Sequence, residues 1–104
     1  MIFVANAIDQ TPNISVITEI EALSWISPDK KKETVVKAFI EDANILPLSP
    51  EVVVQCIKIR RSRKVKTPDA IIAATAIVHN LTLITSDNDF NNIEGLKIVD
   101  PHSL

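Results

Sequence analysis

The stretch TPDAIIAATAIV, residues 67–78, decides the fold of this chain. It begins with a proline at the first helical position and an acid, Asp69, in the first turn, a pattern typical of a helix start. From Ala70 to Val78 it is apolar nearly all round, and such a helix belongs in the middle of a domain. The apolar run Leu81–Thr85 follows directly and predicts a buried strand. A central helix beside a buried strand is therefore expected.

Three further strands are predicted around this centre, at Ile14–Ile17, Ile45–Leu48 and Leu96–Val99. Pro47 places the second of them at the edge of the sheet, because proline cannot donate to a strand ladder. Strands that alternate with helices predict one α/β domain over residues 1–104, with three layers and a mostly parallel sheet.

The predicted helices lie between these strands. Thr18 and Glu21 form a capping-box pattern for a helix that runs to about Trp25.

Asp29–Lys32 is predicted as a polar turn, and a second helix extends from Glu33 to about Ala43. A third helix begins at Ser49-Pro50-Glu51, and its buried face is predicted to consist of Val53, Val54 and Ile57, with Arg60 as a further candidate.

Composition limits the class of protein. With 104 residues, 46% of them apolar, the chain suits one globular domain. A single glycine excludes a Gly-rich phosphate loop, and a net charge of −2 argues against a uniform polycation that acts on nucleic acid. The single cysteine, Cys56, favours a reducing cytoplasm, and neither a signal-like start nor a membrane-length apolar run is recognised, so no membrane association is expected.

Carboxylates follow the strands at the edge of the sheet where ligands of parallel α/β proteins collect. Glu19 and Glu21 follow the first of these strands, Asp87 and Asp89 follow Leu81–Thr85, and Asp69 begins the central helix. Hard oxygen ligands of this kind suit Mg²⁺ or Mn²⁺, which can activate water and neutralise phosphodiester charge.

Each acid also has a purely structural interpretation. Glu21 and Asp69 would stabilise a helix N-terminus, and Asp87-Asn88-Asp89 would form a polar turn. Convergence of three acids at one sheet edge favours the functional interpretation without naming the reaction.

Three blocks together resemble PIN domains, in particular the VapC toxin ribonucleases of bacterial toxin–antitoxin pairs. The blocks are Ile14–Leu23 (ISVITEIEAL), Lys66–Ala76 (KTPDAIIAATA) and Leu83–Phe90 (LITSDNDF), and the likeness covers about residues 13–101. The resemblance implies a sheet of about five strands, a Mg²⁺- or Mn²⁺-dependent endoribonuclease, an RNA substrate, a VapB-like antitoxin partner, and a homodimer or higher oligomer.

The resemblance also assigns residues to the site. It implies that Glu21, Asp69 and Asp87 are catalytic, that these three together with Asp89 bind the metal, and that Thr85 orients the acids or the substrate.

The start of the chain departs from the PIN pattern. PIN domains open with a strand ending in Asp-x-Asn and two helices before the strand that here begins at Ile14, and only thirteen residues precede Ile14. Ala5-Asn6 falls where Asp-x-Asn is expected, and Ala5 has no carboxylate; Asp9 is the candidate substitute. An N-terminally truncated PIN domain without its first catalytic aspartate is therefore expected, with weakened metal binding and impaired activity.

Too few residues separate Asn6 from Ile14 for an ordinary parallel crossover. The first segment then either returns along an unusual extended path or belongs to a lost helical region. A lost central strand would leave strand edges for another chain to cover, which favours an oligomer.

Six of the eleven basic residues lie between Lys58 and Lys66. They either contact RNA phosphates or complement the C-terminal dipole of a helix. The candidates for RNA contact are Arg60, Arg61, Arg63, Lys64 and Lys66. The competing function is a catalytically inactive PIN-like protein that binds RNA or an antitoxin.

Overall fold

The computed structural model describes residues 3–5 and 11–103. They contain a five-stranded sheet in the order β3-β2-β1-β4-β5. Its strands are short: β1 Phe3–Ala5, β2 Asn13–Ser15, β3 Asn44–Leu46, β4 Thr82–Ile84 and β5 Lys97–Val99. Parallel pairing joins β2 to β3 and β4 to β5, and β3 lies at the edge as Pro47 predicts. The predicted α/β fold is confirmed, with a sheet of two parallel pairs.

The central strand, β1, runs antiparallel to both of its neighbours. Seven residues, 6–12, separate it from β2, and a parallel crossover needs a dozen or more. The centre of the sheet is therefore filled, with the direction of this strand reversed. Ala5 pairs with Thr82 at the start of β4. It therefore lies at the opposite end of the strands from the loop that follows β4. The expectation that Ala5 stands at the acidic edge is wrong, and Asp9 lies outside the described residues.

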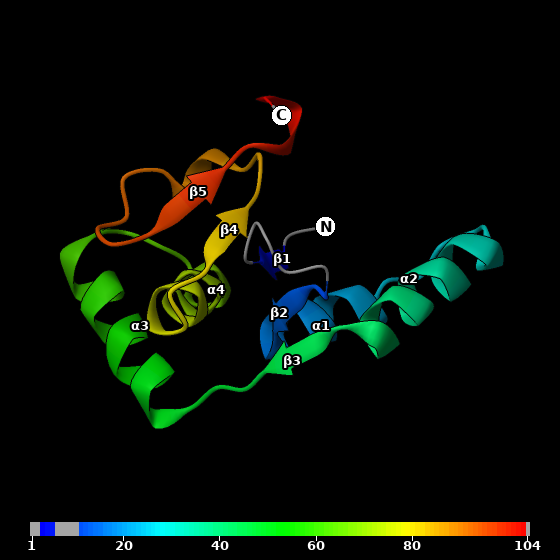
Figure 1. Ribbon diagram of the computed structural model, residues 1–104, viewed down its shortest axis with the longest axis horizontal. Helices are drawn as coiled ribbons and strands as arrows, with labels where there is room; N and C mark the ends of the chain where they lie inside the picture. Colours follow the sequence, from blue (N-terminus) through cyan, green and yellow to red (C-terminus); the bar gives the residue numbers. More distant parts are fainter. Residues whose placement is uncertain (1–2, 6–10, 104) are drawn as a thin grey trace.

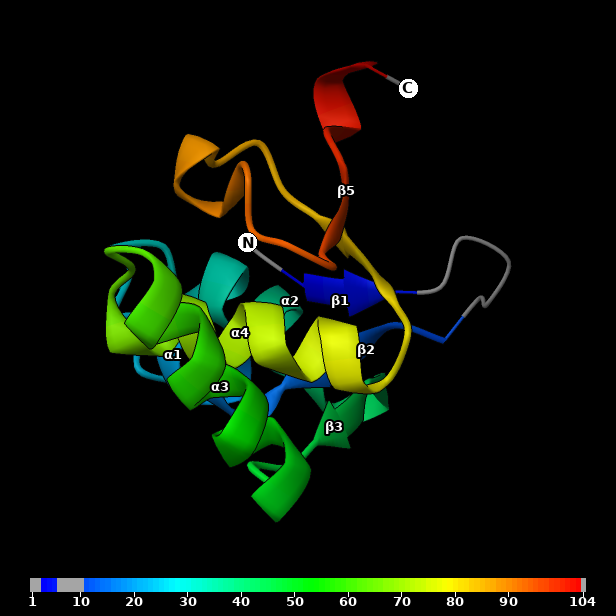
Figure 2. The same ribbon diagram turned by 90° about the vertical axis from the view of Figure 1, so that its left-hand side faces the viewer.

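Helix α4, Thr67–Val78, occupies the centre of the molecule, as its apolar composition predicts. It packs against β1, β2 and β4, and α3, Pro50–Ser62, packs on α4 (Figures 1 and 2). Residues 70 and 72–76 of α4 are buried. The core therefore extends from the sheet through α4 to α3.

Helices α1, Val16–Leu23, and α2, Lys30–Asp42, form a hairpin beside β2 and β3. In Figure 1, α2 projects from the body of the molecule, whose extents are 41 × 27 × 22 Å. Two short 3-10 helices, η1 (Asn88–Phe90) and η2 (Pro101–Ser103), flank β5 along the chain. None of the helices formed by the described residues combines the length and apolar character needed to cross a membrane.

The start of α1 differs from the prediction. Ser15 is the N-cap, and its Oγ accepts a hydrogen bond from the Thr18 N–H at 3.1 Å. Thr18 is therefore a buried residue inside the first turn, and the preceding strand ends at Ser15. Serine and threonine both cap helices well, so sequence alone does not choose between them.

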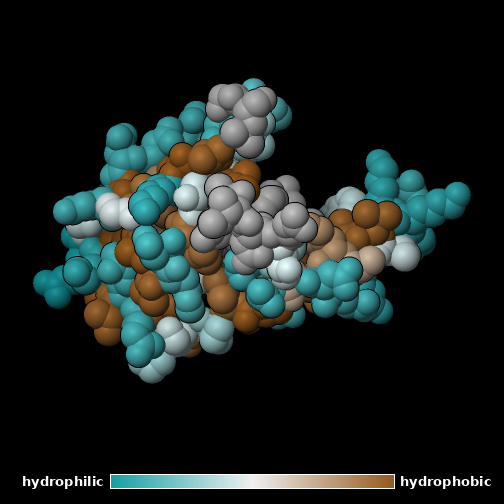
Figure 3. Space-filling model, viewed as in Figure 1, coloured by the Kyte–Doolittle hydropathy of each residue, from teal (hydrophilic) through white to brown (hydrophobic). Residues whose placement is uncertain are grey.

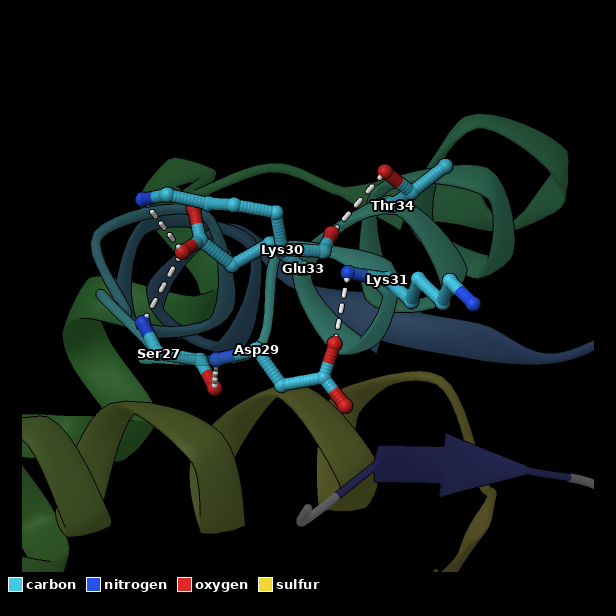
Figure 4. Close-up of polar contacts among 6 residues, drawn as sticks. All are labelled: Ser27, Asp29, Lys30, Lys31, Glu33 and Thr34. Atoms are coloured by element: carbon cyan, nitrogen blue, oxygen red, sulfur yellow. Dashed lines mark hydrogen bonds and ion pairs between the residues drawn. The ribbon is translucent and has the colours of Figure 1, made fainter.

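The start of α2 replaces the predicted polar turn. Asp29 caps the helix by accepting a hydrogen bond from the Lys31 N–H at 3.0 Å (Figure 4). The Ser27 N–H and Lys30 Nζ each lie 2.9 Å from Glu33 Oε2. These contacts lower the pKa of Glu33, the Ser27 hydrogen bond most and Lys30 next. Together they stabilise the first turn of α2 and attach it to Ser27.

The buried face of α3 is also different from the prediction. Val52, Cys56 and Ile59 face the core, whereas the predicted residues are exposed: Val53, Val54, Ile57 and Arg60. Both sets have helical spacing, so periodicity cannot select one. Burial raises the pKa of the Cys56 thiol, and the nearby charge of Arg60 partly opposes that rise.

Candidate active site

The loop after β4 carries two of the predicted acids. The buried Thr85 accepts a hydrogen bond on Oγ1 from the Asp87 N–H at 3.0 Å. Asp87 in turn caps η1, because its Oδ1 accepts from the Asp89 N–H at 2.9 Å. Phe90 follows and is completely buried. The loop is thus attached to the strand by Thr85 and to the core by Phe90.

Asp69 lies beside this loop, in the first turn of α4. Its pKa is raised, first by partial burial and then by the negative charges of Asp87 and Asp89; Lys66 opposes the rise. Helix α4 also contacts η1, so Asp69 lies near the loop that carries Asp87 and Asp89. These acids come from positions about twenty residues apart in the sequence.

Glu21 lies on α1, where its side chain is exposed. The acid in the first turn of this helix is Glu19. Helix α1 packs against α4, the helix that carries Asp69.

A divalent cation would suit the chemistry of these oxygen donors. Within residues 3–5 and 11–103, however, no three His, Cys, Asp or Glu side chains are placed to hold one metal ion together. The described residues do not make a preformed metal centre.

The predicted basic residues gather at the end of α3 and in the turn to α4. A concave surface of about 410 Å³ is lined by residues 60–65. Arg60 Nε donates to the Val65 carbonyl at 3.2 Å, and Arg63 donates to the carbonyl of Asn92. Lys66 is the N-cap residue of α4 and adjoins Asp69. The cationic turn therefore lies next to the acidic group.

One contact of this site was not predicted. Arg63 and Asn92 are 29 residues apart, and no local pattern relates them. Asn92 has a φ of 66°, in the left-handed region that asparagine tolerates better than most residues. In the sequence, the asparagine pair 91–92 indicates a turn. It does not indicate that Arg63 donates a hydrogen bond to the second asparagine.

A family model describes most of the chain. The PIN domain model matches residues 4–96. The chain belongs to the PIN domain family. Members of this family generally depend on divalent metal ions. A comparison with curated proteins returned no match.

Solved structures agree with this assignment. A toxin–antitoxin complex from Klebsiella pneumoniae contains a chain 36% identical to this one; the match covers 86% of this chain and 72% of that chain, with a TM-score of 0.69. A DNA-bound VapBC from Salmonella typhimurium is 26% identical over 85% of this chain and 74% of that one, with a TM-score of 0.69. VapBC2 from Rickettsia felis, bound to a promoter DNA fragment, is 24% identical over 86% and 74% of the two chains and shares the fold at a TM-score of 0.72.

Proposed function

We propose that this PIN domain is a VapC-like endoribonuclease, the toxin of a toxin–antitoxin pair, which hydrolyses RNA phosphodiester bonds with Mg²⁺ or Mn²⁺. The carboxylates of Asp69, Asp87 and Asp89 beside the basic turn carry this proposal, because one surface then presents groups for a cation and for phosphates. The 36% identical relative, a chain of a toxin–antitoxin complex, supports it.

The chain's own residues have distinct roles in this proposal. Asp69 and Asp87 hold the cation with Asp89, and Glu21 completes the acidic set from α1. Thr85 keeps Asp87 in place through its backbone N–H. Arg60, Arg61, Lys64 and Lys66 attract the RNA backbone by charge. A bound divalent cation would supply activated water and neutralise phosphate charge.

The cation is proposed to bind weakly, and the activity to be impaired. No three-ligand group exists among the described residues, so a cation must first draw the carboxylates together against their mutual repulsion. Ala5 lies beside the start of β4, at the opposite end of the strands from Thr85, and has no carboxylate to add. The same observations favour the second candidate function, a PIN-like protein that binds RNA or an antitoxin without hydrolysis.

The deciding experiment is cleavage of a mixed RNA pool by the purified protein with Mn²⁺. EDTA and Asp69→Asn should both abolish cleavage, while Asp42→Asn, an exposed acid at the end of α2, should leave it unchanged. Cleavage that survives Asp69→Asn would contradict the assigned site. A folded protein that binds RNA but does not cut it would support the second function.

The α1–α2 hairpin is proposed as the antitoxin surface. It exposes Ile20, Leu23, Trp25, Ile26 and Val35, and apolar surface lies over α2 in Figure 3. Concave surfaces of about 260 and 380 Å³ combine Trp25 with lysines of α2. This combination fits an acidic, amphipathic segment. Val35→Asp should weaken binding of the antitoxin from the Klebsiella pneumoniae complex, measured by calorimetry; unchanged affinity would place the antitoxin elsewhere.

The second apolar stripe of α3, formed by Val53, Val54 and Ile57, is proposed as the homodimer face. The helix has Glu51 near its start and Arg60 and Arg61 near its end. Antiparallel packing of two copies would therefore set acid against base at both ends, which makes the stripe self-complementary. Val54→Asp should shift the mass measured by light scattering to the monomer, whereas Val35→Asp on the hairpin should not.

A further inference from the structure

One side chain connects the basic turn to the acidic loop. Arg63, the C-cap residue of α3, donates through a guanidinium nitrogen to the carbonyl oxygen of Asn92. Asn92 ends the segment that begins with Asp87 and contains η1. Arg63, an exposed cation of the basic turn, is thus hydrogen-bonded to the loop that carries Asp87 and Asp89.

The position of Arg63 is fixed from its own side. Its N–H donates to the Ile59 carbonyl at 3.1 Å, and Ser62 Oγ donates to the same carbonyl at 3.0 Å. Arg60 Nε closes the turn by donating to the Val65 carbonyl at 3.2 Å, and Val65 is buried. The guanidinium therefore extends from a rigid base.

The acidic loop is held at three points. Thr85 holds its start through the Asp87 N–H, and the buried Phe90 holds its middle. Beyond Phe90, residues 91 and 92 are exposed, and Asn92 accepts the Arg63 hydrogen bond directly before the buried Ile93 returns the chain to the core. The Arg63 contact therefore holds the exposed part of the loop between two buried side chains.

We propose that Arg63 is a positioning residue, which holds the 87–92 loop so that Asp87 and Asp89 remain beside Asp69. Arg63 was predicted to contact RNA phosphates, but its guanidinium donates a hydrogen bond to the Asn92 carbonyl. The effect on RNA cleavage rests on the proposed function. The hydrogen bond between Arg63 and Asn92 does not depend on that function.

Amide hydrogen exchange, followed by NMR, tests the contact directly. Arg63→Met keeps the aliphatic stem and removes the donors. It should accelerate exchange of the η1 amides, Asp89, Phe90 and Asn91, by about five- to tenfold, as expected for the net loss of one ordinary hydrogen bond at an exposed position. Arg61→Met removes the same charge from the same exposed cluster and should leave these rates within about twofold of wild type. Equal rates in the two variants would overturn the proposal.

RNA cleavage supplies the second measurement. Arg63→Met should lower kcat about tenfold with KM nearly unchanged, and Arg63→Lys, which keeps a charged donor, should recover part of the loss. Arg61→Met should instead raise KM. A rise in KM for Arg63→Met with no change in exchange would show a phosphate-binding role and overturn the proposal. If the wild-type protein cuts no RNA, the proposed function fails, and the exchange rates still decide the role of Arg63.

Discussion

Replacing Asp69 by asparagine should stabilise the protein at neutral pH while it damages the site. An acid in the first turn of a helix normally contributes about 0.3–1 kcal/mol of stability. At Asp69, partial burial and the charges of Asp87 and Asp89 raise the pKa, so the ionised form is unfavourable in the folded state. Together these effects exceed the opposing effect of Lys66.

The size of the gain follows from charge pairs near a surface, about 0.2–1 kcal/mol. For a domain of this length, that corresponds to a rise of about 1–8 °C in Tm. The sign depends on pH. A carboxyl whose folded pKa is raised costs stability above that pKa and costs none below the ordinary value of 3.8. The gain from Asp69→Asn should therefore be present at pH 7 and vanish near pH 3.

Thermal unfolding monitored by circular dichroism at both pH values is the assay, with Glu51→Gln as the matched control. Glu51 is the first-turn acid of α3, which also starts with a proline, and Asp87 and Asp89 lie beside the other helix. Glu51→Gln should lower Tm slightly at pH 7, opposite in sign to Asp69→Asn. A similar loss in both variants would refute the clustering of acids around Asp69.

Three further predictions concern the elements that support the site. Phe90→Ala should cost about 3–5 kcal/mol in urea unfolding because the side chain is completely buried; a cost below 1 kcal/mol would mean that the loop is not anchored in the core. Ser15→Ala should cost about 1–2 kcal/mol, since it removes a buried N-cap hydrogen bond, and Ser86→Ala, an exposed serine, serves as its control in the same titration. Glu33→Gln should lower stability more at pH 7 than at pH 3: the pKa of Glu33 is lowered, so its contribution is present above 4.5 and is lost as pH falls through the lower folded value. A wild type and variant that differ equally at both pH values would contradict the last prediction.

Local rules predicted much of the fold. The proline-and-acid starts at residues 49–51 and 67–69 begin α3 and α4, and the apolar runs after Asn80 and Gly95 contain β4 and β5. These signals depend on a few adjacent residues, because caps, prolines and apolar runs act on the nearest turn of the chain. The positions of α3, α4, β4 and β5 were therefore accessible without a structure.

Features that depend on packing were not accessible. The two stripes of α3 are equally periodic, and only the position of α4 decides that Val52, Cys56 and Ile59 are buried. The reversed direction of β1 follows from pairing with β2 and β4 at once, which no short pattern encodes.

The sequence by itself determined which acids and cations are candidates for the site. It also predicted that Asp69 and the acids after β4 lie at the same end of the sheet. Only the tertiary structure decided that Asp69, Asp87 and Asp89 share an electrostatic environment, that Glu21 remains exposed on α1, and that Arg63 holds Asn92. Composition and spacing fix chemical type and local geometry, whereas distances between segments follow from how helices pack on the sheet.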